Sequence, residues 1–287
     1  MTITHPPEPR TALWVYAHPR PGSLNEHLFR TGTESLSARY TVETSDLYEQ
    51  GFDPVLSDRD LGEPEGRSRS IVELSADAYA AGRLPDDVRA EQAKIAAAEL
   101  VVFQFPLWWY GPPAILKGWF DRVMTTGFAH GDLDPELGVP RRYGDGGLAG
   151  RKALIVVTAG EDERSIGRRG VSGDIESLLF PVTHGVLWYT GIEVLDLHVV
   201  YDADGLSGAD VEAQAHRLRT RLDGIDTEPV AAFRRLRDGD YRGTRALRED
   251  LLPGRTDLGI HLAHSGASRL SRDTGCPPRA EITPERT

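Results

Sequence analysis

Apolar and polar positions follow one another along the chain in blocks whose period changes. Residues 12–17, 100–105 and 153–158 form short, almost unbroken apolar runs, whereas residues 41–48 alternate between apolar and polar positions. A further short run, EVLDL, occupies residues 193–197. Unbroken apolar strands are typical of parallel sheets that are covered on both faces. The pattern therefore predicts a parallel sheet of five strands.

Segments with helical periodicity separate these strands. They extend from Asn25 to about Tyr40, from Pro85 to Ala98, from Pro112 to Met124, from Asp174 to His184 and from Asp210 to Leu222. Asn25 is expected to cap the first helix. Residues 51–84, rich in Gly, Pro, Ser and charged residues, are expected to form a loop. Together the segments predict a doubly wound α/β fold with helices on both faces of the sheet.

The alternation of strands and helices fades in the last quarter of the chain. We expect a disordered N-terminal lead at residues 1–11 and one catalytic domain at residues 12–223. An irregular C-terminal appendage is expected at residues 224–266, followed by a polar tail at residues 267–287.

Composition narrows the choice of partners and compartment. The formal net charge of −11 argues against nucleic acid or an anionic membrane as the main partner. Cys276 is the single cysteine, which excludes an intrachain disulfide and fits a reducing compartment. The stretch MTITHPPEPR lacks the pattern of a signal peptide, and no apolar run approaches the roughly 18 residues of a spanning helix. We therefore expect a cytoplasmic protein.

Two stretches have the residue types of a ligand site without its spacing. HGDLDPE, residues 130–136, has no Glu at the closing position of a calcium loop, so we expect no metal there. GDGGLAG, residues 144–150, precedes a strand and lacks the GxGxxG spacing, so we expect a flexible loop.

Three loops are better candidates for a ligand site. A parallel sheet of this kind binds ligands at the carboxyl ends of its strands. The loops at those ends are HPRPGSLN (residues 18–25), PLWWYG (residues 106–111) and TAGEDERSIG (residues 158–167). We expect the three loops to lie close together.

The first loop combines His18, Ser23 and a helix N-terminus. Such a combination can bind a phosphate or pyrophosphate, although an ordinary capped helix with a solvated histidine is the alternative. In the second loop, Trp108, Trp109 and Tyr110 cannot all face one core, so some rings are available to stack on a planar ligand. The alternative is that the two tryptophans only close the end of the sheet.

The third loop offers backbone amides and a glycine. Gly160 would let the backbone approach a flat ligand closely. The acidic run from Glu161 to Glu163 is expected to be a solvated loop surface.

Three long stretches of the chain are similar to one enzyme family. SDLYEQGFDPVLSDRD (Ser45–Asp60), AEQAKIAAAELVVFQFPLWWYGPPAILKGWFDRV (Ala90–Val123) and LGIHLAHSG (Leu258–Gly266) resemble the NAD(P)H:quinone oxidoreductase family of the DT-diaphorase type. The similarity extends from about Leu13 to Gly266 and includes the appendage. It implies a flavodoxin-like fold, non-covalent FAD, with FMN as the alternative, and a homodimer whose two sites lie at the subunit interface.

The resemblance also implies an activity. NAD(P)H would reduce the flavin and leave, and a quinone or similar planar acceptor would then take two electrons in the same pocket, in a ping-pong course. Two alternatives stay open. One is a specialised biosynthetic, azo-reducing or nitro-reducing flavoenzyme with a rebuilt pocket, and the other is a non-enzymatic regulatory flavoprotein.

Carried over position by position, the resemblance implies two sets of contact residues. The residues expected to bind the cofactor are His18, Ser23, Leu24, Asn25, Pro106, Leu107, Trp108, Trp109, Tyr110, Thr158, Ala159, Gly160, Glu161 and Ile166. The residues expected to contact the substrate are Trp109, Tyr110, His130, Asp132, Ser172 and Tyr189.

Several positions differ from the family pattern. Ile166 and Ser172 stand where the family has a tyrosine and a histidine that stabilise the reduced flavin, and Glu161 replaces a glycine. His130 and Asp132 replace two tyrosines that the partner subunit contributes. We take His130 and Ser172 as catalytic candidates. The alternatives are that His130 is a solvated loop residue and that Ser172 leads into the helix at residue 174.

Overall fold

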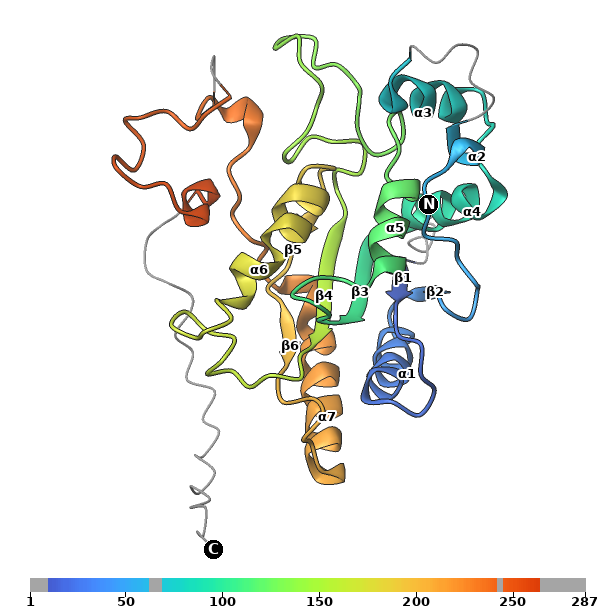
Figure 1. Ribbon diagram of the computed structural model, residues 1–287, viewed down its shortest axis with the longest axis vertical. Helices are drawn as coiled ribbons and strands as arrows, with labels where there is room; N and C mark the ends of the chain where they lie inside the picture. Colours follow the sequence, from blue (N-terminus) through green and yellow to red (C-terminus); the bar gives the residue numbers. More distant parts are fainter. Residues whose placement is uncertain (1–9, 62–68, 242–244, 264–287) are drawn as a thin grey trace, which may run out of the picture.

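A computed structural model describes residues 10–61, 69–241 and 245–263 of the chain. Its centre is a parallel sheet in the order β2-β1-β3-β4-β5, with β6 also paired to β4 (Figure 1). The strands are β1 (Thr11–Tyr16), β2 (Thr41–Asp46), β3 (Leu100–Pro106), β4 (Lys152–Thr158), β5 (Glu193–Val194) and β6 (His198–Val200). The doubly wound α/β fold is therefore confirmed.

The predicted five-stranded path is present in the sheet, and the structure adds one strand to it. The segment expected as a single strand at residues 193–197 is divided, because β5 pairs with the first residues of β4 and β6 with the last. Between them, Leu195 forms an antiparallel bridge with Val230, a residue of the C-terminal segment. The chain thus leaves the edge of β4 and returns to it, and the described sheet has six strands.

Helices cover both faces of the sheet. They are α1 (Leu24–Leu36), α4 (Asp86–Ala97), α5 (Ala114–Val123), α6 (Ile175–Val182), which continues into the π-helix η1 (Thr183–Trp188), and α7 (Gly208–Gly224). Alternate residues of β1 face the two layers: Trp14 packs in the cluster that includes residues of α1 and α7, and Leu13 in the cluster that includes residues of α4, α5 and α6. The period of two along each strand therefore sorts apolar side chains between two cores.

Two local predictions are wrong. Residues 51–84 are not only loop, because they contain α2 (Asp58–Leu61) and α3 (Ile71–Ala80). Helix α3 begins with a capping box in which Ser70 and Glu73 satisfy each other's backbone amides. Asn25 is not the cap of α1 either, since Ser23 is the N-cap and its hydroxyl accepts a hydrogen bond from the Glu26 amide.

The C-terminal segment packs back on the second half of the sheet. The described part of this segment, residues 225–241 and 245–263, contains three short 3-10 helices, Ile225–Thr227, Leu236–Asp238 and Leu258–His261. Trp188 of η1 donates to the backbone oxygen of Arg234 at 3.2 Å, and Phe233 pairs with Leu262. Residues 264–287, with the end of the predicted appendage and the whole predicted tail, lie outside the described residues, as do residues 1–9 of the predicted lead. Within the described ranges, every helix is too short or too polar to cross a membrane.

Candidate functional site

The three candidate loops follow β1, β3 and β4, which are neighbours in the sheet. Backbone hydrogen bonds join their starting points: the Ala17 amide donates to Gln104 at 2.9 Å, and the Leu107 amide donates to Thr158 at 2.8 Å. Pro106 and Thr158 are partners in the strand register. The loops therefore leave the sheet side by side, at its carboxyl edge.

A buried chain of polar side chains holds the start of α1 against this edge. Trp14 Nε1 donates to Gln104 Oε1 at 2.9 Å, and Gln104 Nε2 donates to the backbone oxygen of Asn25 at 2.7 Å. Asn25 Nδ2 in turn donates to Thr158 Oγ1 at 2.9 Å. Gln104 is fully buried and Asn25 is 5% exposed. A satisfied buried network of this kind rigidifies the loops it joins.

Gln104 was not among the predicted site residues. The signal was present in the sequence, because it is the one polar residue in the apolar run at residues 100–105. A buried amide needs partners for both ends of its side chain, and here Trp14 and Asn25 supply them. It acts through Asn25 rather than on a ligand.

The first loop brings together groups that can bind an anion. The amides of Leu24 and Asn25 belong to the first turn of α1, where no preceding helical carbonyl exists to accept them. His18 Nδ1 accepts from the Arg20 amide at 3.2 Å and lies 3.1 Å from Ser23 Oγ. Burial lowers the pKa of His18, so its neutral form is favoured, with the proton on Nε2. Helix amides and an imidazole N–H fit a phosphate group.

The aromatic residues of the second loop lie on a strained two-residue turn. Trp108 and Gly111 exchange backbone hydrogen bonds of 3.0 and 3.1 Å, which close the turn. Its central residues, Trp109 and Tyr110, have φ values of 50° and 60°, a conformation that costs about 1–3 kcal/mol at each non-glycine position. Trp109 is 97% exposed. Its ring is therefore not part of the sheet's packing, and it stands free to stack on a flat ligand.

Trp108 connects the first two loops. Its ring centroid lies 6.4 Å from that of His18, and the residue is 43% exposed. The alternative prediction, that both tryptophans only close the end of the sheet, does not describe Trp109.

In the third loop, Glu161 is the centre of a hydroxyl cluster. Its carboxylate accepts from Tyr110 Oη at 3.0 Å and from Ser172 Oγ at 2.6 Å, and the two hydroxyl oxygens lie 3.2 Å apart. Hydrogen bonds from the hydroxyls of Ser172, Ser165 and Tyr110 lower the pKa of Glu161. The expectation of a merely solvated carboxylate is wrong for this residue, because it links the second loop to the third.

The alternative role of Ser172, as the residue that caps α6, is wrong. Asp174, not Ser172, caps α6, and its side chain accepts from the Glu176 and Ser177 amides. A Cβ at Gly160 would lie 2.8 Å from Asp204 Oδ2, the end of an exposed side chain that can move aside, so this contact alone does not require a glycine.

The remaining predicted cofactor contacts are more buried. Thr158, Ala159 and Ile166 are 3%, 1% and 2% exposed. Ile166 packs in the apolar core that includes residues of α4, α5 and α6, so its side chain is not part of the hydroxyl cluster.

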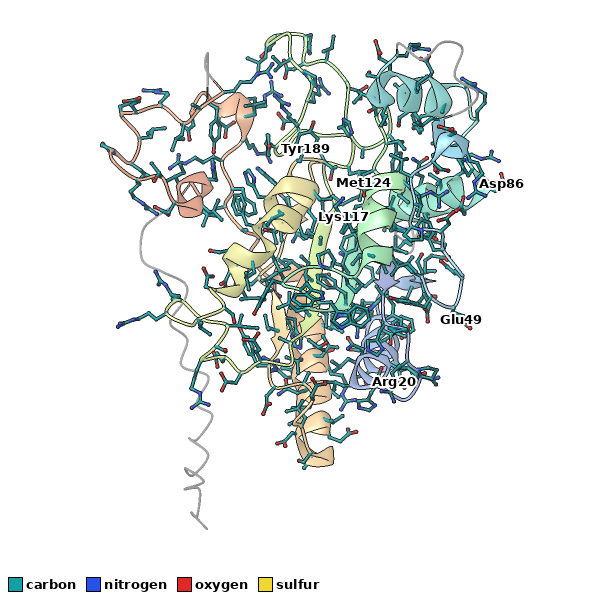
Figure 2. The ribbon with its side chains drawn as sticks, in the orientation of Figure 1. Arg20, Glu49, Asp86, Lys117, Met124 and Tyr189 are labelled. Carbon is teal, nitrogen blue, oxygen red and sulfur yellow. The ribbon has the colours of Figure 1, made fainter. Side chains whose placement is uncertain are left out.

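His130, Asp132 and Tyr189 lie at the other end of the molecule. The rings of His130 and Tyr189 pack at right angles with centroids 5.5 Å apart, and burial lowers the pKa of His130. Figure 2 shows Tyr189 at the opposite end of the sheet from Arg20, which belongs to the first loop. Ser172 and Tyr189 flank the two ends of α6 and η1, 14 residues from Ile175 to Trp188, or roughly 20 Å of helix. One protomer therefore does not bring the two predicted groups of substrate contacts together.

A small cavity at the amino ends of the strands is not a candidate. It has a volume of about 100 Å³ and is lined by residues that include Arg10, Tyr40, Glu99, Lys152 and Asp226. Pockets for cofactors are typically several times larger, about 300 Å³ or more. Among the described residues, no group of three His, Cys, Asp or Glu side chains is placed to hold a metal ion.

The sheet order and the three loops at its carboxyl edge define a flavodoxin-like protein. In agreement, residues 10–222 match a family described as having a flavodoxin-like fold. A ribosyldihydronicotinamide dehydrogenase-like protein of Penicillium crustosum is 40% identical over 275 residues, which cover 94% of this chain and 96% of that protein. NAD(P)H dehydrogenase [quinone] 1 of Rattus norvegicus is 38% identical over 195 residues, 67% of this chain and 69% of that protein.

Solved structures agree with this assignment. A structure assigned as a candidate quinone reductase of Klebsiella pneumoniae is 38% identical and superposes with a TM-score of 0.84, over 88% of this chain and all of that one. The chain belongs to the NAD(P)H:quinone oxidoreductase family of flavodoxin-like proteins. The resemblance drawn from the three sequence stretches is confirmed.

Proposed function

We propose that the chain is a flavin-dependent NAD(P)H oxidoreductase that reduces a quinone or a similar planar acceptor by two electrons in a ping-pong course. The observation that carries the proposal is the exposed aromatic turn at Trp109 and Tyr110, beside a helix N-terminus suited to a phosphate. The names of the relatives, quinone and ribosyldihydronicotinamide dehydrogenases, support the same chemistry.

The residues of the three loops fit a flavin nucleotide. When bound, the flavin accepts a hydride from NAD(P)H and passes two electrons to the acceptor. Ser23, His18 and the first amides of α1 would hold its phosphate, and Trp109 would cover the flat ring system. We propose FAD, with FMN as the alternative. The mass of the cofactor released by denaturation distinguishes the two.

The separation of the predicted substrate contacts supports a homodimer. His130, Asp132 and Tyr189 can approach the aromatic turn only from a second copy of the chain, because within one protomer they lie at the other end of α6 and η1. We propose that the two sites lie at the subunit interface. The single cysteine supports a reducing, cytoplasmic location.

We expect the purified protein to be yellow and to lose its visible flavin absorbance anaerobically when NADH or NADPH is added. A neutral quinone should then restore the absorbance in the same cuvette. The measurement is a stopped-flow or cuvette absorbance trace in each half-reaction. Absence of bleaching with both nucleotides, in protein that contains flavin, contradicts the proposed function.

Trp109→Gly tests the role of the exposed ring without disturbing the turn, since glycine adopts positive φ freely. We expect a flavin dissociation constant raised by about tenfold to a hundredfold, or about 1.4–2.7 kcal/mol, because a stacking surface is lost. Fluorescence titration of the cofactor-free protein measures it. Val72→Ala on α3, which removes part of another exposed apolar side chain, is the control and should leave the constant unchanged. Equal effects of the two substitutions contradict the assignment.

A further inference from the structure

We propose that Glu161 determines acceptor specificity: its carboxylate, held beside the Tyr110 ring, favours neutral and cationic planar acceptors over anionic ones. The inference rests on the proposed function, because it assumes that the acceptor stacks on the aromatic turn. It concerns the choice among acceptors, which the proposed function leaves open.

Hydrogen bonds hold the carboxylate of Glu161 in one place. One oxygen accepts from Tyr110 at 3.0 Å and the other from Ser172 at 2.6 Å. The backbone amide of Ser172 donates to the carbonyl oxygen of Ser165 at 3.1 Å, so the serine is itself fixed within the third loop. A flat molecule that lies against Tyr110 therefore has this carboxylate at the edge of the ring on which it stacks.

The hydrogen-bond partners of the Glu161 carboxylate are the hydroxyl groups of Tyr110, Ser172 and Ser165. The nearest arginine in sequence, Arg164, is engaged by Asp162, with hydrogen bonds of 3.0 and 2.6 Å from its guanidinium. Arg169 and Asp204 are both exposed, so solvent screens the charge of each. The carboxylate at the end of the Tyr110 side chain is therefore held by neutral hydroxyl groups, which leave its negative charge in place.

The two hydroxyl hydrogens of the cluster point at the carboxylate. Tyr110 and Ser172 both donate to Glu161, so neither presents a free O–H to an acceptor. Ser172 is therefore a positioning residue, because its hydroxyl holds the carboxylate of Glu161. The edge of the site offers negative charge and hydroxyl lone pairs, which repel an anionic substituent and attract a cationic one.

The experiment compares two acceptors with the same ring system, a neutral naphthoquinone and a naphthoquinone sulfonate, in the flavin-loaded protein. We measure kcat/KM for each and take the ratio, so that changes in overall activity cancel. The unmodified protein should prefer the neutral quinone. In Glu161→Gln that preference should shrink by about tenfold, the effect of one partly solvated unit charge a few ångströms away.

Glu163→Gln is the matched control. Glu163 is an exposed carboxylate of the same loop, two residues along the chain, so the substitution changes the net charge equally. It should leave the ratio within twofold of the unmodified protein. An unchanged ratio in Glu161→Gln, or an equal change in both variants, overturns the inference.

A second measurement covers the case in which Glu161→Gln does not fold. In the unmodified protein the preference for the neutral quinone should decrease as ionic strength rises, since salt screens the carboxylate. A preference that is independent of salt, or that is absent at low salt, overturns the inference. The two failures are distinguishable: without the proposed function NAD(P)H does not bleach the flavin, whereas without the specificity role bleaching persists and only the ratio is unaffected.

Discussion

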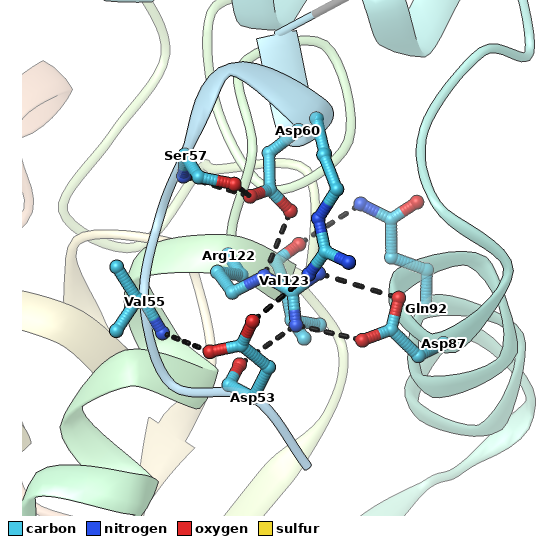
Figure 3. A network of polar contacts seen from close by, with 9 residues as sticks. Asp53, Val55, Ser57, Asp60, Asp87, Gln92, Arg122 and Val123 are labelled. Atoms are coloured by element: carbon cyan, nitrogen blue, oxygen red, sulfur yellow. Dashed lines mark hydrogen bonds and ion pairs between the residues drawn. The ribbon is translucent and has the colours of Figure 1, made fainter.

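Replacing Arg122 by methionine is expected to lower the free energy of unfolding by about 3–5 kcal/mol, because it leaves buried acceptors without their cation. Arg122 of α5 is 1% exposed. Its guanidinium donates to Asp60 Oδ1 at 2.7 Å, to the Asp53 backbone oxygen at 2.8 Å and to Asp87 Oδ2 at 2.7 Å (Figure 3). Asp60 is itself only 2% exposed, so its charge cannot be solvated without opening the fold.

This network anchors the helix that follows the aromatic turn. Figure 3 shows Arg122 at the centre of groups from the segment at residues 53–60, which runs into α2, from α4 and from α5. Its guanidinium also lies over the ring of Phe52, 5.0 Å from the centroid. Loss of the arginine therefore releases three segments that are joined by one side chain.

Urea or thermal unfolding measures the effect. Arg59→Met is a suitable control, because Arg59 also pairs with an aspartate, Asp53 at 2.8 Å, but with 70% of its side chain exposed. A surface pair of this kind contributes only about 0–1 kcal/mol. If Arg122→Met destabilises no more than Arg59→Met, the network does not stabilise the fold as argued.

Acidification is expected to destabilise the protein through His198, from about pH 6.5 downward, by about 1.4 kcal/mol per pH unit until pH approaches 3. His198 in β6 is 3% exposed, and its Nε2 has no hydrogen-bond partner among the described residues. Burial, together with the charges of Arg217 and Arg221, lowers the pKa of His198 to about 3. Both arginines are held near β6 by hydrogen bonds to the backbone oxygens of Val199 and Asp196.

The direction follows from proton binding. Between the pKa of about 3 in the folded state and the ordinary value of about 6.5 in the unfolded state, only the unfolded chain binds the proton at His198. The unfolded state therefore gains stability as pH falls, and the folded protein loses it. His184, whose pKa is lowered to about 4 by burial and by His261, adds to the same trend.

Other carboxylates and histidines also titrate in this range, so the test is a comparison of variants. Between pH 6 and pH 4, His198→Gln should reduce the slope of the unfolding free energy against pH by about 1.4 kcal/mol per pH unit, which is the contribution of one proton. His216→Gln, on the exposed surface of α7, should leave the slope unchanged. An unaltered slope in His198→Gln would falsify the prediction.

The wrong local predictions show where short-range rules stopped applying. Asn25 has the residue type of a helix cap, but its amide is taken by Thr158, 133 residues away, and Ser23 caps the helix instead. Helix α3 has a readable capping box at Ser70 and Glu73, yet Ile71 and Val72 are exposed rather than buried. The apolar residues of α3 therefore indicate a helix only weakly. The surrounding Gly and charged residues favoured the prediction of a loop.

What the sequence alone determined is the sheet and the edge at which the three candidate loops lie. Unbroken apolar runs separated by helical periods predict parallel strands, and parallel strands place their following loops at one edge. The proposal that those loops bind an anion and a flat ligand follows from the residue types at His18, Ser23 and the aromatic turn.

Only the tertiary structure decided how distant residues act together. Glu161 is an ordinary loop carboxylate in sequence, but folding brings Tyr110, 51 residues away, and Ser172 to its two oxygens. Conversely, Ser172 and Tyr189 are separated by the length of α6 and η1, so one protomer keeps them apart. Long-range hydrogen bonds and the length of a helix decide which of these residues meet. Neither can be predicted from the periodic pattern of apolar residues.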